Sequence, residues 1–398
     1  MVKVKKMTPK QRLNLSGIPN ELLLIIDILK HDKLQENRFR VSSVDWEEFV
    51  RLVKHHRVYP QVYIKLVEYP ITFIPDYVMK ILKQLYQKNT FHMLHLSGAM
   101  VKVSQLFSDN SIKALFLKGP ILATDIYGEL SLRTCSDLDV LIHIDNLEEV
   151  DALLKYNGYK KDDYITTILS DWKWRHHHVT YYHPENKVKV EIHWRLNPGP
   201  SKEPGFKELW SSRREKPISS HNSLAYLGRE HLLCFLLTHG ARHGWSRLRW
   251  LEDVRLLLQQ DIEWENVDGI LREYQCTHLY KKTLLLCTEL FSTSTHLETQ
   301  RNFEDQQSVH LAQQTLYYLE NKVNLHSTPL PVDIAEFHKK YLFLIKPFQQ
   351  KVWFYLSLLH PYPEDLHTLY LPKKLHFLYF PLRPFLSVWR RTRKNALQ

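Results

Sequence analysis

The chain has 398 residues, of which 24% are charged and 44% hydrophobic, and its formal net charge is +11. This length is enough for two or three domains, and the composition is ordinary for a soluble globular protein. The four cysteines lie far apart in the sequence without a Cys-x-x-Cys pair, which excludes a disulfide framework and a zinc ribbon. The 11 glycines and the many leucine-rich periodic segments favour helices around a small sheet.

The start of the chain shows no targeting or membrane-spanning pattern. The first residues are basic, but no long apolar run with a cleavage site follows, and the apolar run 22–26 is bounded by Glu21 and Asp27. We therefore expect a cytoplasmic protein without a transmembrane segment. The positive charge is compatible with nucleic acid, anionic lipid or phosphate-rich ligands, although no nucleic-acid-binding module is evident.

Residues 1–108 are predicted to form an N-terminal helical domain. Asp45 precedes Trp46 and is a candidate cap for one helix. The pair Pro75-Asp76 begins another helix, which we expect to continue to about Leu106 because apolar residues recur at helical spacing.

Residues 109–198 are predicted to form the core, a small mixed sheet. Here short apolar or alternating segments are separated by turn-rich stretches. The expected elements are a strand near 113–118, a helix near 119–127, a strand near 138–144, a helix near 146–157 and a hairpin formed by 176–182 and 187–194.

Two aspartates, one residue apart, open the strand near 138–144. Side chains alternate faces along a strand, so Asp137 and Asp139 point the same way while Leu138 and Val140 point into a core. Adjacent carboxylates repel each other unless a cation lies between them, and hard oxygen ligands suit Mg²⁺. An Asp-x-Asp pair alone can also simply begin a strand after a turn.

The hairpin supplies a third acidic side chain. Polar and apolar residues alternate from Lys187 to Trp194, which places Glu191 and His193 on one face. Glu191 facing the two aspartates would complete a three-carboxylate site for two metal ions. Taken alone, Glu191 could equally be a surface residue and His193 a packed histidine.

The remaining chain is assigned by composition and periodicity. Residues 199–222 are predicted to be a linker loop, 223–340 a helical domain, and 341–398 a C-terminal helical and basic tail. Pro381 and Pro384 are expected to break any long amphipathic helix in that tail, which favours a packed tail over membrane contact.

The segment 239–253 is rich in histidine, arginine and tryptophan. His239 and Arg242 could contact phosphates or an acceptor, as could Arg249, and the alternative is a helix corner with packed rings. The pair His239 and His243 lacks the glutamate of the zinc-protease motif, so zinc is not expected.

Three segments together resemble a known family. They are Leu117-Lys-Gly119 followed by Arg133 and Asp137-Leu-Asp139, then Glu191-Ile-His-Trp194, then the block 239–253. This combination resembles an uncharacterised nucleotidyltransferase-like branch of the DNA polymerase beta-type nucleotidyltransferase superfamily. The resemblance implies an α+β fold with a small mixed nucleotidyltransferase-type sheet embedded between predominantly helical domains. One departure is Lys118-Gly119-Pro120 in place of the usual Gly-Ser or Gly-Gly, which removes a serine contact to phosphate.

The resemblance also implies a reaction and its residues. A nucleoside monophosphate would move from a nucleoside triphosphate to an acceptor hydroxyl on a small molecule or peptide, with Mg²⁺ or Mn²⁺ as cofactor. Asp137, Asp139 and Glu191 would hold the metals and carry catalysis, Glu191 also helping to deprotonate the acceptor. Candidates for nucleotide or phosphate binding are Lys118, Gly119, Arg133, His193, His239 and Arg242.

Three other functions remain open from the sequence. A nucleotide-sugar could bind the same metal–diphosphate site and donate its sugar, or the chain could be a non-catalytic nucleotide-binding module. A nucleic-acid enzyme is the third and less favoured alternative. No sequence feature selects the acceptor.

Overall fold

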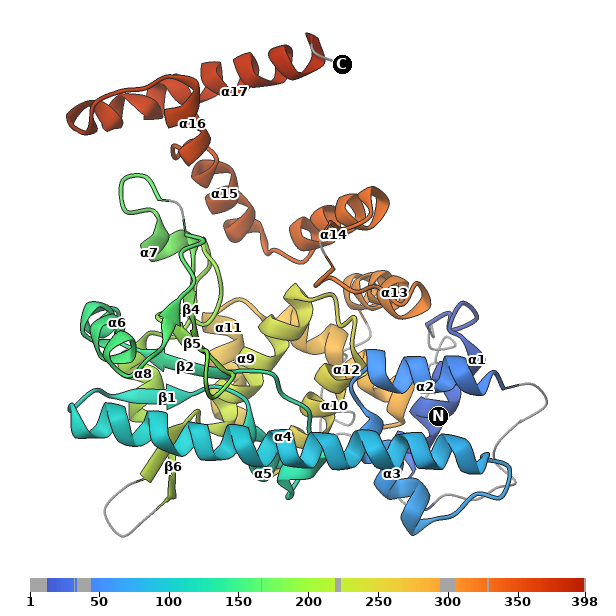
Figure 1. Cartoon of the computed structure of the whole chain (residues 1–398). Helices are drawn as coiled ribbons and strands as arrows, with labels where there is room; N and C mark the ends of the chain where they lie inside the picture. The colour runs from blue at the N-terminus through green and yellow to red at the C-terminus, as the bar shows by residue number, and fades with distance from the viewer. Residues whose placement is uncertain are drawn as a thin grey trace, which may run out of the picture.

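A computed structural model describes residues 13–31, 33, 44–165, 167–218, 223–293, 305–327 and 329–396. It confirms the α+β class, because a seven-stranded mixed sheet is combined with helices that precede and follow it in the sequence (Figure 1). Within the described ranges, no helix combines the length and the apolar character needed to cross a membrane.

Among the described residues, four helices form the N-terminal part, and two of them begin where the sequence predicted, at Asp45 and at Pro75-Asp76. They are α1 (Asn20–Lys30), α2 (Trp46–His55), α3 (Tyr59–Glu68) and α4 (Asp76–Asp109). Asp45 caps α2 as expected, since its Oδ1 accepts hydrogen bonds from the backbone N–H groups of Glu47 and Glu48, both at 3.0 Å. The long helix α4 passes in front of the sheet in Figure 1.

The sheet has the strand order β3-β4-β5-β2-β1-β7-β6. Its strands are β1 (Ala114–Phe116), β2 (Leu138–Ile142), β3 (Lys160–Lys161), β4 (His178–His183), β5 (Val188–His193), β6 (Arg214–Pro217) and β7 (Ser223–Tyr226). β2 is central, antiparallel to β1 and parallel to β5, and all five of its residues are buried. The predicted hairpin is confirmed as β4 and β5.

The sequence interpretation of 199–222 as loop is wrong in part. This segment contains helix α8 (Phe206–Ser211) and strand β6, and β7 lies at the start of the stretch predicted to be helical. The signal was weak because β6, Arg-Glu-Lys-Pro, is polar and exposed at an edge of the sheet and lacks apolar alternation. The domain limits proposed at 108, 198, 222 and 340 stay predictions.

The other helices of the described residues lie between these strands in the sequence or follow them. They are α5 (Pro120–Ile126), α6 (Leu147–Tyr156), α7 (Trp172–Arg175), α9 (Arg229–Arg242), α10 (Leu248–Leu257), α11 (Trp264–Glu273), α12 (Thr277–Phe291), α13 (Gln306–Glu320), α14 (Val332–Leu344), α15 (Phe348–Ser357), α16 (Pro363–Thr368) and α17 (Tyr379–Ala396). One hydrophobic core joins the N-terminal helices to α9–α13, and a second packs α4 and α6 against the sheet.

The C-terminal tail corrects two expectations. Helix α17 is a single 18-residue helix although Pro384 lies inside it, because one proline removes only one backbone hydrogen bond from a helix with several turns. The tail is packed on the body only in part: Tyr341 and Ile345 pack against the cores, whereas α16 and α17 project away in Figure 1, where Phe385 is 73% exposed. Asp365 on α16 pairs with Arg383 at 3.0 Å and with Arg390 at 2.6 Å.

Arg133, predicted to bind phosphate, is instead buried in an ion pair that joins the segment before β2 to α10. Its Nε and Nη2 donate to Oδ1 and Oδ2 of Asp253, both at 2.8 Å, and the Tyr127 hydroxyl donates to Oδ1 at 2.7 Å. Burial alone lowers the pKa of Arg133, but Asp253 more than offsets this, so its pKa is raised overall. The phosphate role of Arg133 is therefore replaced by a structural one.

Breaking this pair is predicted to destabilise the protein strongly. Asp253→Asn should lower the free energy of unfolding by about 3–5 kcal/mol, because it leaves the Arg133 charge buried without a counter-charge. Arg51→Ala is the control, since Arg51 forms a surface pair with Glu48 and should change stability by less than about 1 kcal/mol. Urea unfolding of both variants measures the effect. Equal midpoints for the two variants would contradict a stabilising role for Asp253.

Candidate functional site

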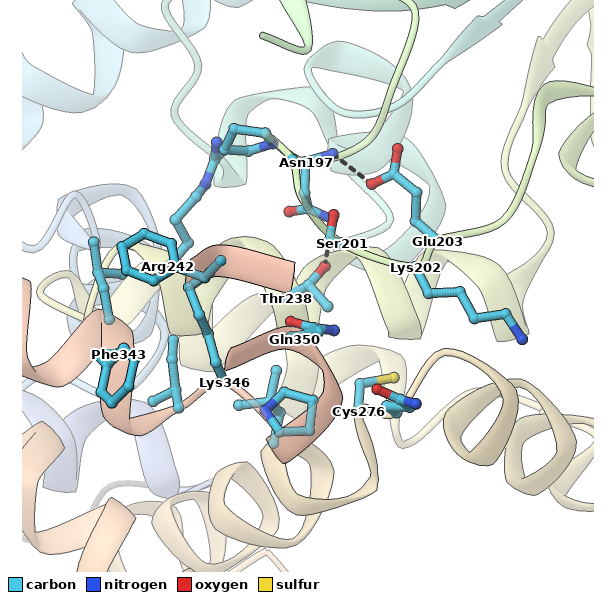
Figure 2. Close-up of a pocket in the computed structure, with 18 of the residues that line it drawn as sticks. Asn197, Ser201, Lys202, Glu203, Thr238, Arg242, Cys276, Phe343, Lys346 and Gln350 are labelled. Atoms are coloured by element: carbon cyan, nitrogen blue, oxygen red, sulfur yellow. Dashed lines mark hydrogen bonds between the residues drawn. The ribbon is translucent and has the colours of Figure 1, made fainter. Parts of the chain in front are cut away.

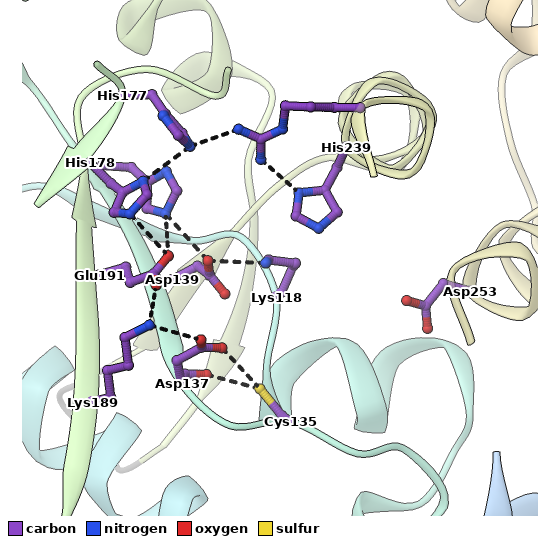
Figure 3. Close-up of polar contacts among 12 residues, drawn as sticks. Lys118, Cys135, Asp137, Asp139, His177, His178, Lys189, Glu191, His239 and Asp253 are labelled. Atoms are coloured by element: carbon purple, nitrogen blue, oxygen red, sulfur yellow. Dashed lines mark hydrogen bonds and ion pairs between the residues drawn. The ribbon is translucent and has the colours of Figure 1, made fainter. Parts of the chain in front are cut away.

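The pairing of β2 with β5 brings the predicted carboxylates together. In this parallel register Asp139 is the partner of Glu191, and Leu141 is the partner of His193. Asp137 lies directly before β2, and its side chain is 22% exposed, against 2% for Asp139 and 15% for Glu191. Figure 3 shows the three carboxylates side by side, with Asp253 well apart from them.

Two lysines neutralise part of this negative charge. Lys118 Nζ lies 3.0 Å from Asp139 Oδ1, so Lys118 reaches the site as the sequence suggested. Lys189 Nζ lies 2.5 Å from Glu191 Oε1 and 3.6 Å from Asp137 Oδ2. Lys189 was not among the predicted site residues, although its position two before Glu191 on the same strand face was a usable signal.

The two aspartates experience opposite electrostatic environments. Burial and the charge of Asp139 raise the pKa of Asp137. Burial also acts to raise the pKa of Asp139, but Lys118 and His193 reverse this and lower it. Glu191 behaves like Asp139, since His193, His178 and Lys189 overcome burial and hold its pKa far below the ordinary value.

His193 turns its Nε2 towards the carboxylates, and Asp139 and Glu191 overcome burial and raise the pKa of this imidazole. Its Nδ1 lies 3.3 Å from the carbonyl oxygen of Arg195, and a carbonyl can only accept, so Nδ1 carries the hydrogen in the neutral ring. Its Nε2 lies 3.3 Å from Asp139 Oδ1 and 3.7 Å from Glu191 Oε2. The Nε2 lone pair would face the carboxylate oxygens unfavourably unless a proton or a metal ion lay between them.

Two buried atoms here lack hydrogen bonds. Among the described residues, neither Asp139 Oδ2 nor His193 Nε2 has a hydrogen-bond partner. Asp139, Glu191 and His193 offer donor atoms within 4.8 Å of one another. Buried polar atoms are normally satisfied, so this donor set fits a divalent cation.

Gly119 forms the turn between β1 and α5. Its φ is +87°, a conformation that favours glycine, and a Cβ there would lie 3.5 Å from the Asp137 carbonyl oxygen and 3.7 Å from Cys135 Sγ. The backbone at Gly119 therefore lies against the segment that carries Asp137. Its contact with phosphate stays a prediction.

Arg242 and His239 approach the same site from α9. Arg242 Nη1 donates to His177 Nε2 at 3.0 Å, and Nη2 donates to His239 Nδ1 at 3.4 Å. Burial lowers the pKa of His239 well below its ordinary value, so this imidazole is neutral and can accept. Arg249 instead donates to the Thr134 carbonyl oxygen at 2.5 Å, away from the cluster.

His177 and His178, at the start of β4, were missed as site residues. The rings of His178 and His193 lie 5.0 Å apart, and His178 Nε2 is 3.7 Å from Glu191 Oε2. Burial and the neighbouring His193 lower the pKa of His178 to about 4. The usable signal was the run of three histidines on the strand predicted to pair with 187–194.

A cavity of about 950 Å³ adjoins this cluster at Arg242. Figure 2 shows its walls, which come from the segment 196–204, one face of α9, the turn before α12, and α14 with α15. Cys234 and Cys276 both line it with their sulfur atoms 3.4 Å apart, although they are distant in the sequence.

A protein family described as an uncharacterised nucleotidyltransferase family matches residues 42–292. The chain belongs to this nucleotidyltransferase family. The matched range contains every residue of the cluster, and membership supports nucleotidyl transfer as the general activity. No curated protein shows significant similarity to the chain.

Two solved structures are similar to this member of the family. An antigenic nucleotidyltransferase-like protein from Paracoccidioides brasiliensis has 15% identity and a TM-score of 0.32, covering 52% of this chain and 97% of its own. JHP933 from Helicobacter pylori has 17% identity and a TM-score of 0.26, covering 67% of this chain and 98% of its own.

Neutralising the two aspartates is predicted to change stability in opposite directions. At pH 7 without metal, Asp137→Asn should raise the melting temperature, because the raised pKa of Asp137 means that folding penalises its charge. Asp139→Asn should lower it, because the lowered pKa of Asp139 means that folding favours its charge.

The Asp137 effect should shrink as the pH falls through its raised pKa towards the ordinary aspartate value of about 3.9, whereas the Asp139 effect should persist at pH 4 and be lost only at lower pH, because the lowered pKa of Asp139 keeps it charged. Thermal unfolding in EDTA at pH 7 and at pH 4 tests this. A stabilised Asp139→Asn variant would contradict the described pairing with Lys118.

Proposed function

We propose that the protein transfers a nucleoside monophosphate from a nucleoside triphosphate to an acceptor hydroxyl, with a divalent cation held by Asp137, Asp139 and Glu191. The observation that carries the proposal is the convergence of these carboxylates on two neighbouring strands, with Asp139 Oδ2 buried and unsatisfied among the described residues. Family membership supports the same general activity.

The residues divide the chemistry among them. A bound cation would supply Lewis-acid polarisation of the reacting phosphate and neutralise developing charge. Lys118, freed from Asp139 when a cation takes its place, would offset the charge of the triphosphate. The acceptor oxygen bonds to the α-phosphorus as the bond from that phosphorus to the oxygen shared with the β-phosphate breaks. Pyrophosphate leaves with that oxygen, and the hydroxyl proton of the acceptor passes to water.

The environment of Glu191 modifies the role implied by the family resemblance. A general base works best with a pKa near the operating pH, whereas the neighbours of Glu191 hold its pKa far below that. A carboxylate that stays charged suits metal binding. We therefore assign Glu191 as a ligand rather than as the group that deprotonates the acceptor.

The imidazoles bear on which cation is used. His193 Nε2 and His178 Nε2 both face Glu191 Oε2 at 3.7 Å. His193 also donates its other ring N–H to a backbone carbonyl, which is the usual arrangement of a metal-binding histidine. Mg²⁺ prefers oxygen ligands, while imidazole suits transition metals, so we propose that Mn²⁺ binds more tightly than Mg²⁺.

Mn²⁺ bound to the protein is predicted to show nitrogen coordination. Electron spin echo envelope modulation should detect coupling to nitrogen that changes on ¹⁵N-histidine labelling and weakens in His193→Ala and His178→Ala. His183→Ala, at the other end of β4, is the matched control and should leave the signal unchanged. Mn²⁺ binding without nitrogen coupling would mean an oxygen-only site and would leave nucleotidyl transfer standing.

Activity is predicted to depend on all three carboxylates. Asp137→Asn and Asp139→Asn should abolish nucleotide transfer, and Glu191→Gln should reduce it by at least about 100-fold, since losing even an outer-shell partner of a metal costs about 10–100-fold. Asp145→Asn is the control, because Asp145 lies beyond the opposite end of β2 and is exposed.

The assay presents nucleoside triphosphates and sugar nucleotides with Mn²⁺ or Mg²⁺ to a metabolite and peptide extract, and reads products by mass spectrometry. A nucleotide mass added to an acceptor supports the proposal. A sugar mass would replace it by glycosyl transfer, and nucleotide binding without any product would indicate a binding module. Normal turnover in either aspartate variant would show that the carboxylate site is not catalytic.

A further inference from the structure

A cavity lies next to the carboxylate cluster, and Asp137, Asp139 and Glu191 are not among the residues that line it. It is lined by the segment 196–204, by α9 and by α14–α15, and one of its lining residues, Arg242, also bonds to His177 in the cluster. The Glu191 and Asp139 carboxylates act on the pKa of Arg242, although burial dominates and lowers it to about 10. One end of the cavity therefore meets the site.

A single face of α9 leads from the cavity to the site. Cys234, Thr238 and Arg242 are spaced four residues apart, so they stand in one row along the helix, and all three line the cavity. Figure 2 shows Thr238 and Arg242 on this wall. A molecule lying along the row would place one end at Arg242, beside His177.

The deeper walls are largely apolar. Side chains from α12 and from α14–α15 supply most of this surface, namely Leu279, Leu342, Phe343, Ile345 and Phe354. Pockets of this size that are apolar with a few polar groups commonly bind small molecules. The charged groups then determine which end of such a molecule lies where.

Positive charge in the cavity exceeds negative charge. Five basic residues line it, Lys202, Arg242, Lys339, Lys340 and Lys346, against two acidic residues, Glu203 and Glu336. Glu203 is already engaged, because its carboxylate accepts hydrogen bonds from the backbone N–H groups of Leu196 and Asn197 at 3.0 and 2.9 Å. Glu203 therefore does not neutralise the basic side chains of the cavity.

Two of these cations lack an anionic partner. Among the residues that the structure describes, no carboxylate forms an ion pair with Arg242 or Lys346, and Arg242 Nε is buried without a hydrogen-bond partner. Lys346 is half-buried with its Nζ 5.8 Å from the Phe354 ring, and burial lowers its pKa. Keeping unpaired charges out of water is costly, which favours an anion as their counter-charge.

We infer that this cavity binds the acceptor, and that the acceptor is a small amphipathic anion with an apolar body, a phosphate or carboxylate group and the hydroxyl that receives the nucleotide. The role of the bound molecule as acceptor rests on the proposed function, whereas the binding of an amphipathic anion in the cavity does not. The anionic group lies between Arg242 and Lys346, and the apolar body lies along the row on α9.

The test uses octyl phosphate as the probe in calorimetric titration, without nucleotide or metal. Inorganic phosphate and 1-octanol serve as the charge-only and apolar-only comparisons, and octyl carboxylate (nonanoate) distinguishes phosphate from carboxylate recognition. Octyl phosphate or nonanoate should bind at least about tenfold more tightly than either comparison, since one hydrogen bond to a charged group is enough for that factor.

Variants locate the binding. Lys346→Met should weaken octyl phosphate binding about tenfold. Lys351→Met is the matched control, because Lys351 also lies near an aromatic ring, 5.2 Å from Phe343, but does not line the cavity. Thr238→Trp should fill the cavity beside α9 and abolish binding. If this variant fails to fold, Ala335→Trp, on the exposed α14 wall, should block the same cavity.

Binding that persists in both blocking variants, or 1-octanol binding as tightly as octyl phosphate, overturns the inference. Because the titration needs neither metal nor nucleotide, its failure leaves the proposed nucleotidyl transfer intact. Conversely, loss of the metal site in Asp137→Asn would leave octyl phosphate binding unchanged if the inference is right.

Discussion

The parallel register of β2 against β5 is the constraint on which the site depends. Pairing Asp139 with Glu191 and Leu141 with His193 places two acids and an imidazole on one face, while Val140 and Ile192 enter the core on the other. A slip of one residue would turn all of these side chains over, burying charge in the apolar core and moving apolar side chains into the polar site. The hydrophobic pattern that fixes the register of the sheet therefore also orients the polar side chains of the site.

Charge balance in the metal-free cluster explains how such a site can fold. Lys118, Lys189 and His193 stand against three carboxylates, and two of the acids keep lowered pKa values as a result. The compensation is incomplete at Asp137, whose pKa is raised. The protein thus holds some unfavourable charge in place before any ligand arrives, as expected where polar groups are arranged for binding rather than for stability.

The sequence predicted β1, β2, β4 and β5 because alternation along a strand is local, and that pattern with a family resemblance was enough to predict that Asp137, Asp139 and Glu191 lie together. What it missed depends on distant pairing. Arg133 looked free for phosphate because nothing near it in sequence reveals Asp253. His177 and Lys189 became site residues only once β4 and β5 were placed beside β2. The polar edge strand β6 carried no apolar alternation to recognise.

The pair of Arg133 with Asp253 also bears on how this architecture can change in evolution. One partner comes from the segment that leads into β2, and the other from a helix 120 positions later. Recombination that exchanged the sheet alone, or the later helices alone, would leave Arg133 or Asp253 buried without its counter-charge. We therefore expect the sheet and α10 to be inherited together, and substitutions to be tolerated better in parts that share no such pair, such as the projecting C-terminal helices.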